Sequence, residues 1–282
     1  MIPLIEKISG KRVGKDFGFC YNPSFIALGD VINNITKPAF VLLGKSDTKA
    51  GEEIEKIYKK IIINKSSIQK MNIISAEITK ISLNAFVTMK ISFANFIGLI
   101  SNNYKNANAD SITAALGLDD RIGKKYLKPG TPYGGPCFPR DNKCFAKFVE
   151  NIGFKSSLAL ATDEINVQVR KEKIKIVINY AQLNSCNSIF IYGLSYKPNT
   201  NICEESFSIY LVKSLLKIDN INIVFFDPLV TKEDLSLYID QVRGIEKVEK
   251  IEDVNKSDIV VLCHELDKSD AKYNAVKDHK KV

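Results

Sequence analysis

Histidine is nearly absent from this chain: His264 and His279 are the only two among 282 residues. General acid–base chemistry therefore falls to a carboxylate, a lysine or water. The six cysteines are widely scattered and none forms a CxxC pair. With so few histidines, this pattern predicts no metal site. Scattered thiols without a disulfide framework are typical of a reducing compartment, so we expect a cytoplasmic protein.

Two further absences limit the possible functions. The N-terminal residues contain no long apolar segment, so we expect neither a signal peptide nor a membrane span. Nowhere does a strand–GxGxxG–helix unit occur. The net charge is +8, but the basic residues are interleaved with acidic ones and form no basic block. This predicts a solvated basic surface suited to a small anionic substrate, and no nucleic-acid partner.

The most distinctive stretch that is present covers residues 130–141, GTPYGGPCFPRD. Its paired glycines permit a tight turn and close approach of another group. Prolines on both sides of Cys137 restrict the backbone. Arg140 and Asp141 follow at once, and a nearby cation favours the nucleophilic thiolate. The stretch is either a nucleophile loop or a turn with an incidental thiol. Taken alone, Asp141 is best interpreted as a helix N-cap.

Residues 73–105 give the longest helical pattern, apolar over much of its circumference, which predicts a buried central helix. Lys80 and Asn84 interrupt it four residues apart and therefore share one helix face. Buried polar groups require partners. Either Lys80 extends to the surface and Asn84 caps a neighbour, or the pair faces a developing negative charge.

The chain divides into three predicted domains of an α/β protein. Residues 1–65 form a partial α/β unit, with strands at 17–21 and 40–43 and a helix at 47–62. Residues 66–184 are helical, with helices at 111–116, 141–151 and 157–183 besides the central one. Residues 185–282 alternate strands (188–192, 221–226, 258–262) with helices (205–216, 231–242), which predicts a parallel sheet. Ligands bind at the carboxyl ends of such strands, where Lys197 lies; a solvated loop lysine is the alternative.

Together these pieces resemble the nucleotide-sugar dehydrogenases, and especially the UDP-glucose 6-dehydrogenases. The motifs that carry the resemblance are Asn22-Pro23-Ser24-Phe25, Ala76–Phe86, Lys90–Asn95, Arg121-Ile122-Gly123, Gly134–Asp141 and Gly193–Thr200. Several ordered motifs at family-like spacing are far more specific than any one of them. The resemblance implies a remnant of a Rossmann domain, a long central helix with a helical dimerisation region, and a C-terminal Rossmann-like parallel sheet.

The resemblance also implies a reaction. It is the two-step oxidation of a UDP-sugar C6 alcohol to the uronate, with two NAD reduced and a thioester on Cys137. Lys80, Asn84 and Asp141 match the residues that hold the reacting oxygen and activate water. A homodimer and a UDP-sugar substrate are implied, with no membrane partner.

Further matches concern the substrate and the cofactor. Arg121 matches an arginine that reaches the nucleotide sugar across the dimer. The loop along the sugar and phosphates spans Tyr126–Tyr133 and leads into Gly134. Its matched substrate contacts are Tyr126, Leu127, Lys128, Tyr133 and Gly134, together with Lys197. Arg140 is a weaker match to a cofactor contact.

This sequence departs from the family in three ways. It starts late in the family's NAD-binding domain, so we expect roughly a hundred residues of a dinucleotide fold to be missing and turnover to be impaired. Ser24 replaces a glutamate thought to assist thioester hydrolysis. Glu204 replaces an arginine on the NAD side. A non-catalytic nucleotide-sugar-binding or dimerisation fragment is therefore the alternative, as is a UDP-N-acetylhexosamine dehydrogenase.

Overall fold

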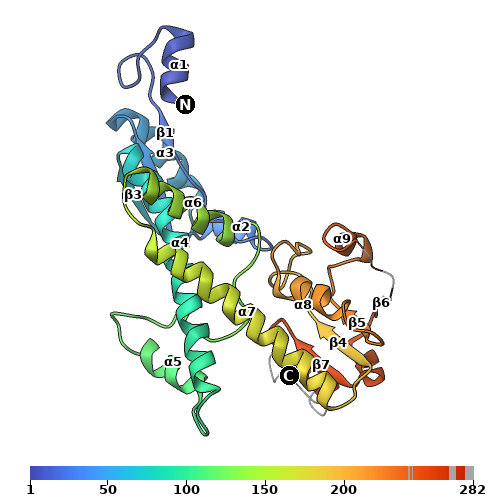
Figure 1. Ribbon diagram of the computed structural model, residues 1–282. Helices are drawn as coiled ribbons and strands as arrows, with labels where there is room; N and C mark the ends of the chain where they lie inside the picture. Colours follow the sequence, from blue (N-terminus) through green and yellow to red (C-terminus); the bar gives the residue numbers. More distant parts are fainter. Residues whose placement is uncertain (241, 243, 267–270, 277–282) are drawn as a thin grey trace. The chain divides into compact units, whose positions relative to one another are not determined.

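The computed structural model describes residues 1–240, 242, 244–266 and 271–276. The chain divides into two compact units, Met1–Leu83 and Asn84–Val282, and one long helix runs from the first into the second (Figure 1). The predicted three-domain boundaries at 65/66 and 184/185 stay predictions.

The first unit is built on a three-stranded sheet, order β1-β2-β3. Strands β1 and β2 are antiparallel, whereas β2 and β3 are parallel and joined by helix α3. Asp47 caps α3, because its carboxylate accepts a hydrogen bond from Ala50 N at 2.9 Å. The elements are α1 (Ile2–Ser9), β1 (Cys20–Tyr21), α2 (Val31–Thr36), β2 (Phe40–Lys45), α3 (Thr48–Ile61) and β3 (Ser67–Met71).

Two features of this unit differ from the prediction. The strand expected at 17–21 is only the two-residue β1. Strand β3 was missed because its sequence, SIQKM, has no apolar run and two of its residues are half-buried while three are exposed. It is defined by its pairing with the buried strand β2, in register from Phe40 opposite Ser67 to Gly44 opposite Met71. Tertiary context therefore decides this strand.

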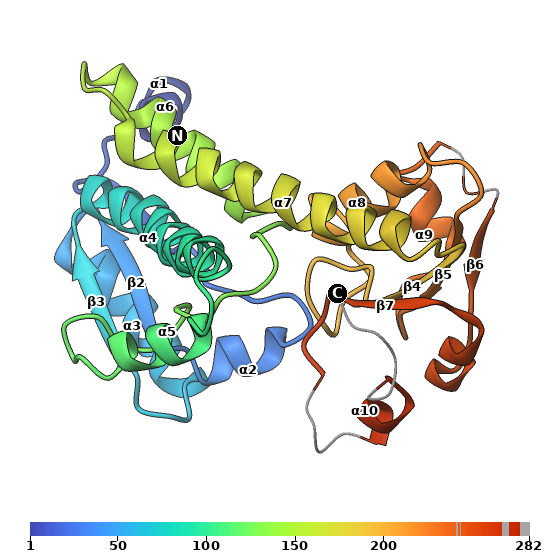
Figure 2. The same ribbon diagram turned by 60° about the horizontal axis from the view of Figure 1, so that its bottom comes forward.

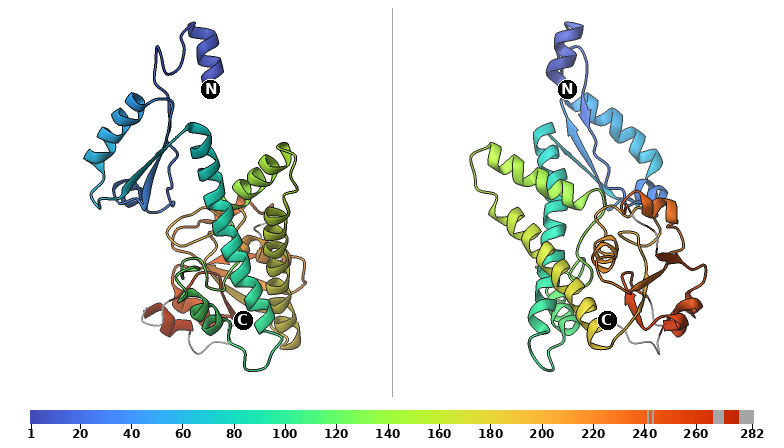
Figure 3. Two further views of the ribbon diagram at one scale, coloured as in Figure 1. Left: turned by 90° about the vertical axis from the view of Figure 1, so that its left-hand side faces the viewer. Right: turned by 45° about the vertical axis from the view of Figure 1, so that its right-hand side comes forward.

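Helix α4 runs on into the second unit, three further helices follow it, and the left-hand view of Figure 3 shows α4 and α7 side by side. Ser92 Oγ on α4 donates to Thr162 O on α7 at 2.8 Å, which joins the two helices directly. Helix α7 has the bounds that the sequence predicted. The helices are α4 (Ile73–Ser101), α5 (Ala109–Gly117), α6 (Phe138–Asn151) and α7 (Ser157–Leu183).

A four-stranded parallel sheet, order β6-β5-β4-β7, completes the unit (Figure 2). Side chains alternate across it: Ile189 and Ile191 join a core that includes α7 and α8, whereas Phe190 packs with η1 and α10 on the other face. The elements are β4 (Ser188–Tyr192), α8 (Phe207–Leu215), β5 (Asn222–Phe226), α9 (Lys232–Ser236), β6 (Ile245–Lys247), η1 (Ile251–Lys256), β7 (Ile259–Leu262) and α10 (Ala271–Val276).

The strand order places a topological switch point between β4 and β7. From β4 the chain moves outward to β5 and β6, then returns to pair β7 on the other side of β4. In open parallel sheets, ligands bind at the carboxyl ends of the strands beside this point. The segments there begin at Gly193 after β4 and at Cys263 after β7.

Helix α4 is less buried than its apolar composition predicted. It is long and apolar enough to cross a membrane by those two criteria, yet only 33% of its most apolar window is buried within the chain. Phe86, Phe93, Phe96 and Ile100 are exposed at intervals of seven, three and four residues. They therefore form one apolar stripe along the helix, which we call the α4 stripe.

Candidate active site

Cys137 lies at the N-cap of α6, and its side chain is exposed. Its carbonyl accepts the first bond of the helix, from Asp141 N at 2.8 Å. The interpretation of Asp141 as the N-cap is therefore wrong: the helix begins three residues earlier, because Pro139 is well tolerated in the first turn. Cys137 is thus placed where unpaired backbone N–H groups favour negative charge.

The Asp141 carboxylate is the centre of a polar cluster beside Cys137 along α6. Asn84 Nδ2 donates to Asp141 Oδ2 at 2.7 Å. Arg140 Nη2 lies 2.9 Å from the other carboxylate oxygen, and this hydrogen bond raises the pKa of the guanidinium. Asn84 is 8% exposed. The amide of α4 and the carboxylate of α6 therefore meet, and the catalytic roles of both residues stay predictions.

Lys80 belongs to the first unit, one helical turn before Asn84 on α4. Its Nζ lies 5.0 Å from the centroid of the Phe25 ring, a cation–π contact. Phe25 ends the Asn-Pro-Ser-Phe motif, whose Asn22 side chain donates to Leu42 O at 2.9 Å. The structure therefore brings Lys80 to that motif, and its role beside Cys137 stays a prediction.

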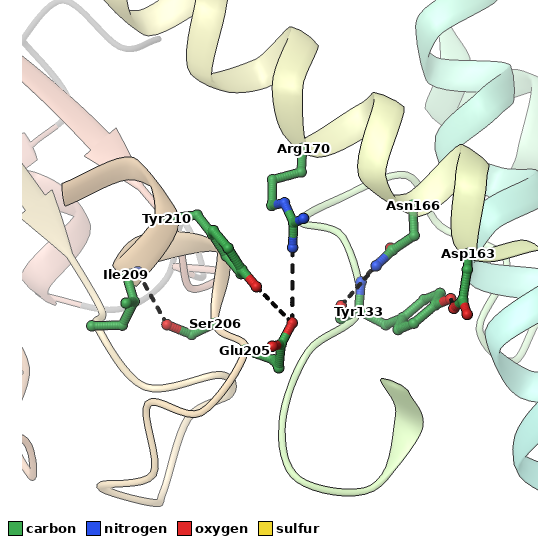
Figure 4. A network of polar contacts seen from close by, with 8 residues as sticks. All are labelled: Tyr133, Asp163, Asn166, Arg170, Glu205, Ser206, Ile209 and Tyr210. Carbon is green, nitrogen blue, oxygen red and sulfur yellow. Dashed lines mark hydrogen bonds and ion pairs between the residues drawn. The ribbon is translucent and has the colours of Figure 1, made fainter. Parts of the chain in front are cut away.

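The loop before Cys137 is held by two buried asparagines. Asn95 accepts from Gly130 N at 2.7 Å and donates to Thr131 O at 3.3 Å. Asn166 accepts from Tyr133 N at 2.9 Å and donates to Tyr133 O at 3.0 Å (Figure 4). Each amide thus satisfies a loop donor and a loop acceptor, which fixes the path of the backbone.

Two residues of this loop that were expected to contact substrate are buried. Leu127 is 4% exposed and Tyr133 7%. The Tyr133 hydroxyl donates to Asp163, and burial together with that bond raises the pKa of the phenol. Any contact these two residues make with a ligand would use their backbone atoms, and their substrate roles stay predictions.

The cysteine loop packs tightly on the segment that precedes α8. Gly135 N donates to Glu204 O at 2.9 Å. A Cβ added to Gly134 would lie 2.1 Å from Glu205 O, and one added to Gly135 would lie 2.5 Å from the Tyr196 ring. Gly135 also has φ of 81°. Glycine is therefore required at both positions.

A buried aspartate and a buried histidine organise the loop after β4. Asp227 Oδ2 accepts from Leu194 N at 2.8 Å and from the backbone and hydroxyl of Ser195 at 3.2 and 3.1 Å. His264 Nε2 lies 2.8 Å from Ser195 O. A carbonyl only accepts, so Nε2 carries the proton. His264 is therefore no base for the Ser195 hydroxyl, and the three residues form a scaffold rather than a nucleophilic triad.

Three cations of the expected substrate site have acidic or aromatic neighbours. Lys128 Nζ contacts Glu265, just after β7. Lys197 Nζ lies 5.7 Å from the centroid of the Tyr196 ring, in the loop after β4. Lys197 thus belongs to one segment at the switch point, and Lys128 contacts the other. Arg121 pairs with Asp119 at 2.6 Å and is 89% exposed. Tyr126 is also exposed, with φ of 60°.

Sequence reasoning missed the asparagines and acids that hold these loops. Asn95 could have been found from its spacing, because it follows Asn84 by eleven residues and therefore lies on the same helix face. Asp227 precedes Pro228 at a strand end and carries no pattern that distinguishes it from a turn residue. Asp163 and Asn166 interrupt an otherwise ordinary helix pattern. Their partners are thirty or more residues distant in sequence.

Comparisons with known proteins agree with this architecture. Residues 74–168 match the central domain of the UDP-glucose/GDP-mannose dehydrogenase family. Residues 190–282 match the UDP-binding domain of the same family. The chain belongs to this family. The matched UDP-binding domain contains the sheet and the switch point described above.

Similar proteins carry related names. The UDP-glucose 6-dehydrogenase of Haloferax volcanii is 29% identical over 232 residues, which cover 82% of this chain and 53% of that protein. That of Rhizobium meliloti is 32% identical over 197 residues, 69% of this chain and 45% of that protein. The chain thus spans about half the length of the curated relatives it matches.

The fold has solved counterparts. A UDP-glucose dehydrogenase structure from Pyrobaculum islandicum superposes with a TM-score of 0.79 at 24% identity, covering 93% of this chain and 59% of that one. This likeness confirms the predicted fold class. Helix α4 lies almost wholly within the matched central domain. That match favours a core helix of a dehydrogenase over a membrane span.

Proposed function

We propose that this chain binds a UDP-sugar beside the β4–β7 switch point and that Cys137 is the covalent nucleophile of a UDP-glucose 6-dehydrogenase reaction. The observation that carries the proposal is the docking of the Cys137 loop onto the segment before α8, through Gly134 and Gly135. It brings an exposed thiol loop to the domain that binds nucleotides in this family. Lys128 and Lys197 supply positive charge for the phosphates.

The chain's own residues supply the covalent and the hydrolytic steps of this reaction. Cys137 Sγ attacks the C6 aldehyde, a C–S bond forms, and the carbonyl electron pair moves to oxygen. Backbone N–H groups at the start of α6 and the free amide hydrogen of Asn84 are suited to stabilise that oxyanion. In the last step Asp141 accepts a proton from water, which attacks the thioester and expels the thiolate.

NAD supplies the oxidising power of the proposed reaction. One alcohol, one water and two NAD⁺ give one carboxylate, two NADH and three protons. The residues present do not fit the whole cofactor, because the sequence has no strand–GxGxxG–helix unit to hold a pyrophosphate. Arg140 is occupied with Asp141 at 2.9 Å. We assign no hydride-transfer step to residues of this chain.

The alternative of a non-catalytic nucleotide-sugar-binding fragment has one specific observation behind it. Ser24 is exposed and stands where the family has a glutamate, so this position supplies no base for thioester hydrolysis. The alternative predicts that UDP-sugars bind and that Cys137 forms no adduct.

Alkylation of Cys137 tests the proposal without any need for turnover. Iodoacetamide is added to the full chain with and without UDP-glucose, and modification of each cysteine is followed by peptide mass spectrometry. Cys144, seven residues later on α6 and also exposed, is the internal control. We expect UDP-glucose to slow modification of Cys137 and to leave Cys144 unchanged. Equal rates with and without the nucleotide sugar at both cysteines would contradict the proposal.

The C6 aldehyde formed from UDP-glucose distinguishes a covalent nucleophile at Cys137 from a non-catalytic binding fragment. A nucleophilic Cys137 adds to this aldehyde reversibly and forms a thiohemiacetal. Borohydride does not trap that adduct, so the readout is protection of Cys137 from alkylation. We expect the aldehyde to protect Cys137 far longer than UDP-glucose does at equal occupancy. Equal protection by both ligands would favour the non-catalytic fragment.

We further propose a homodimer formed through the α4 stripe. Four large apolar side chains spaced along one helix face are costly to leave in water and are suited to a second copy of the same helix. Cytoplasmic location is proposed as well, in keeping with the free cysteines.

A further inference from the structure

Glu205 has an unusual backbone at the place where the cysteine loop docks. Its φ is 52°, in the left-handed region that non-glycine residues rarely adopt. Its carbonyl faces Gly134, where even a methyl group would clash. The preceding carbonyl, of Glu204, accepts the hydrogen bond of Gly135 N. The left-handed turn therefore presents two successive carbonyls to the two glycines that lead to Cys137.

The Glu205 side chain is anchored on the far side of this turn. Its Oε2 accepts a hydrogen bond from the Tyr210 hydroxyl at 2.8 Å and lies 3.9 Å from Arg170 Nη1 (Figure 4). The guanidinium of Arg170 stacks on the Tyr210 ring, 3.6 Å from its centroid. Arg170 and Tyr210 thus support each other as well as the carboxylate.

Helix α7 holds both the cysteine loop and the turn at Glu205, and it does so from one face. Asp163 and Asn166 hold Tyr133 of the cysteine loop, and Arg170 lies one turn later, toward Glu205. Spacings of three and four residues place the three α7 side chains on the same face. Figure 4 shows them pointing toward the two loops.

We infer that Glu205 is a positioning residue for Cys137: its carboxylate, anchored by Tyr210 and Arg170, holds the left-handed turn on which Gly134 and Gly135 rest. A strained residue persists when its surroundings over-determine it, and strain of this kind gathers at functional sites. Without the anchor, the turn relaxes toward an ordinary conformation. The carbonyls then leave the glycines, and the backbone at Cys137 shifts. The inference rests on the proposed role of Cys137.

The test measures the alkylation rate of Cys137 relative to Cys144 across the pH range, with no nucleotide present. We expect Glu205→Ala to change the ratio by about fivefold, since relaxation of one strained backbone residue redistributes the loop conformations. Tyr210→Phe removes the short hydrogen bond, keeps the ring under Arg170, and is expected to shift the ratio in the same direction. Glu205→Gln retains an acceptor for Tyr210 and is expected to restore most of the wild-type ratio.

Glu249→Ala is the matched control, because Glu249 also forms one long ion pair, 3.8 Å from Lys247 Nζ. We expect it to leave the ratio and its pH dependence unchanged. A Glu205→Ala ratio equal to wild type, or an equal shift in Glu249→Ala, would overturn the inference. If Glu205→Ala fails to fold, Tyr210→Phe decides by the same criterion. The proposed function fails separately, through loss of UDP-glucose protection in the wild-type chain.

Discussion

At the scale of single residues, Asn84 and Asp141 show what position in a sequence can and cannot indicate. The spacing of Asn84 from Lys80 predicted a polar helix face, and the structure supplies the partner, 57 positions later. No local pattern pairs residues at that separation. The motif around Cys137 pointed to Asp141, yet the expected place of Asp141 as the N-cap was wrong because the helix begins earlier.

The Asn84–Asp141 hydrogen bond has a measurable cost of removal. Asn84→Ala leaves a carboxylate that is only 14% exposed without its neutral donor. We expect the free energy of unfolding to fall by about 1.5–3 kcal/mol, which is typical of a hydrogen bond to a charged group. The measurement is the urea midpoint of wild type and variant. Asn103→Ala, which removes an exposed hydrogen bond at 2.8 Å from the turn after the same helix to Leu99 O, is the control and should change the midpoint little.

The buried thiol of Cys263 predicts a pH dependence of stability. Burial raises its pKa from 9.0 to about 12. The unfolded chain therefore loses this proton at a lower pH than the folded chain, so stability falls as pH rises from 9.0 toward 12. We expect Cys263→Ala to show a shallower decline of melting temperature over this range than wild type. Cys144→Ala, which removes an exposed thiol, should keep the wild-type slope.

At the scale of elements, regular patterns were predicted well and partner-dependent ones poorly. Helix α7 and strand β4 have the bounds read from the sequence, because local hydrophobic patterning and the residues that flank each element predict both. Strand β3 depends on its partner β2, and the helix expected at 231–242 is only the five-residue α9. The burial of α4 was overestimated, since apolar composition does not distinguish a core face from an exposed one.

The cysteine loop allows a comparison between two of its own glycines. An alanine Cβ at Gly134 would lie 2.1 Å from Glu205 O, whereas one at Gly130 has open space within 4 Å. We therefore expect Gly134→Ala to lower the melting temperature clearly and Gly130→Ala to leave it nearly unchanged. Differential scanning calorimetry of the two variants checks this. Equal melting temperatures would contradict the tight docking of the loop.

At the scale of the whole molecule, the α4 stripe predicts how copies of the chain associate. Phe93, 48% exposed, lies in the middle of the stripe. We expect Phe93→Glu to convert a dimer into a monomer, because a charge in an apolar interface lacks a partner. Light scattering after gel filtration gives the mass. Leu183→Glu, at an 85% exposed position at the end of α7, is the control and should remain dimeric.

Titration calorimetry with UDP-glucose tests the central claim most directly. The family's UDP-binding domain and the switch point between β4 and β7 both predict that the chain binds this ligand. Lys197→Ala removes a cation from the loop after β4, so we expect binding about tenfold weaker, typical of a lost charge-assisted contact. Heat of binding in wild type, reduced in Lys197→Ala, is the predicted result. No heat of binding in the wild-type chain at high UDP-glucose concentration would contradict the account.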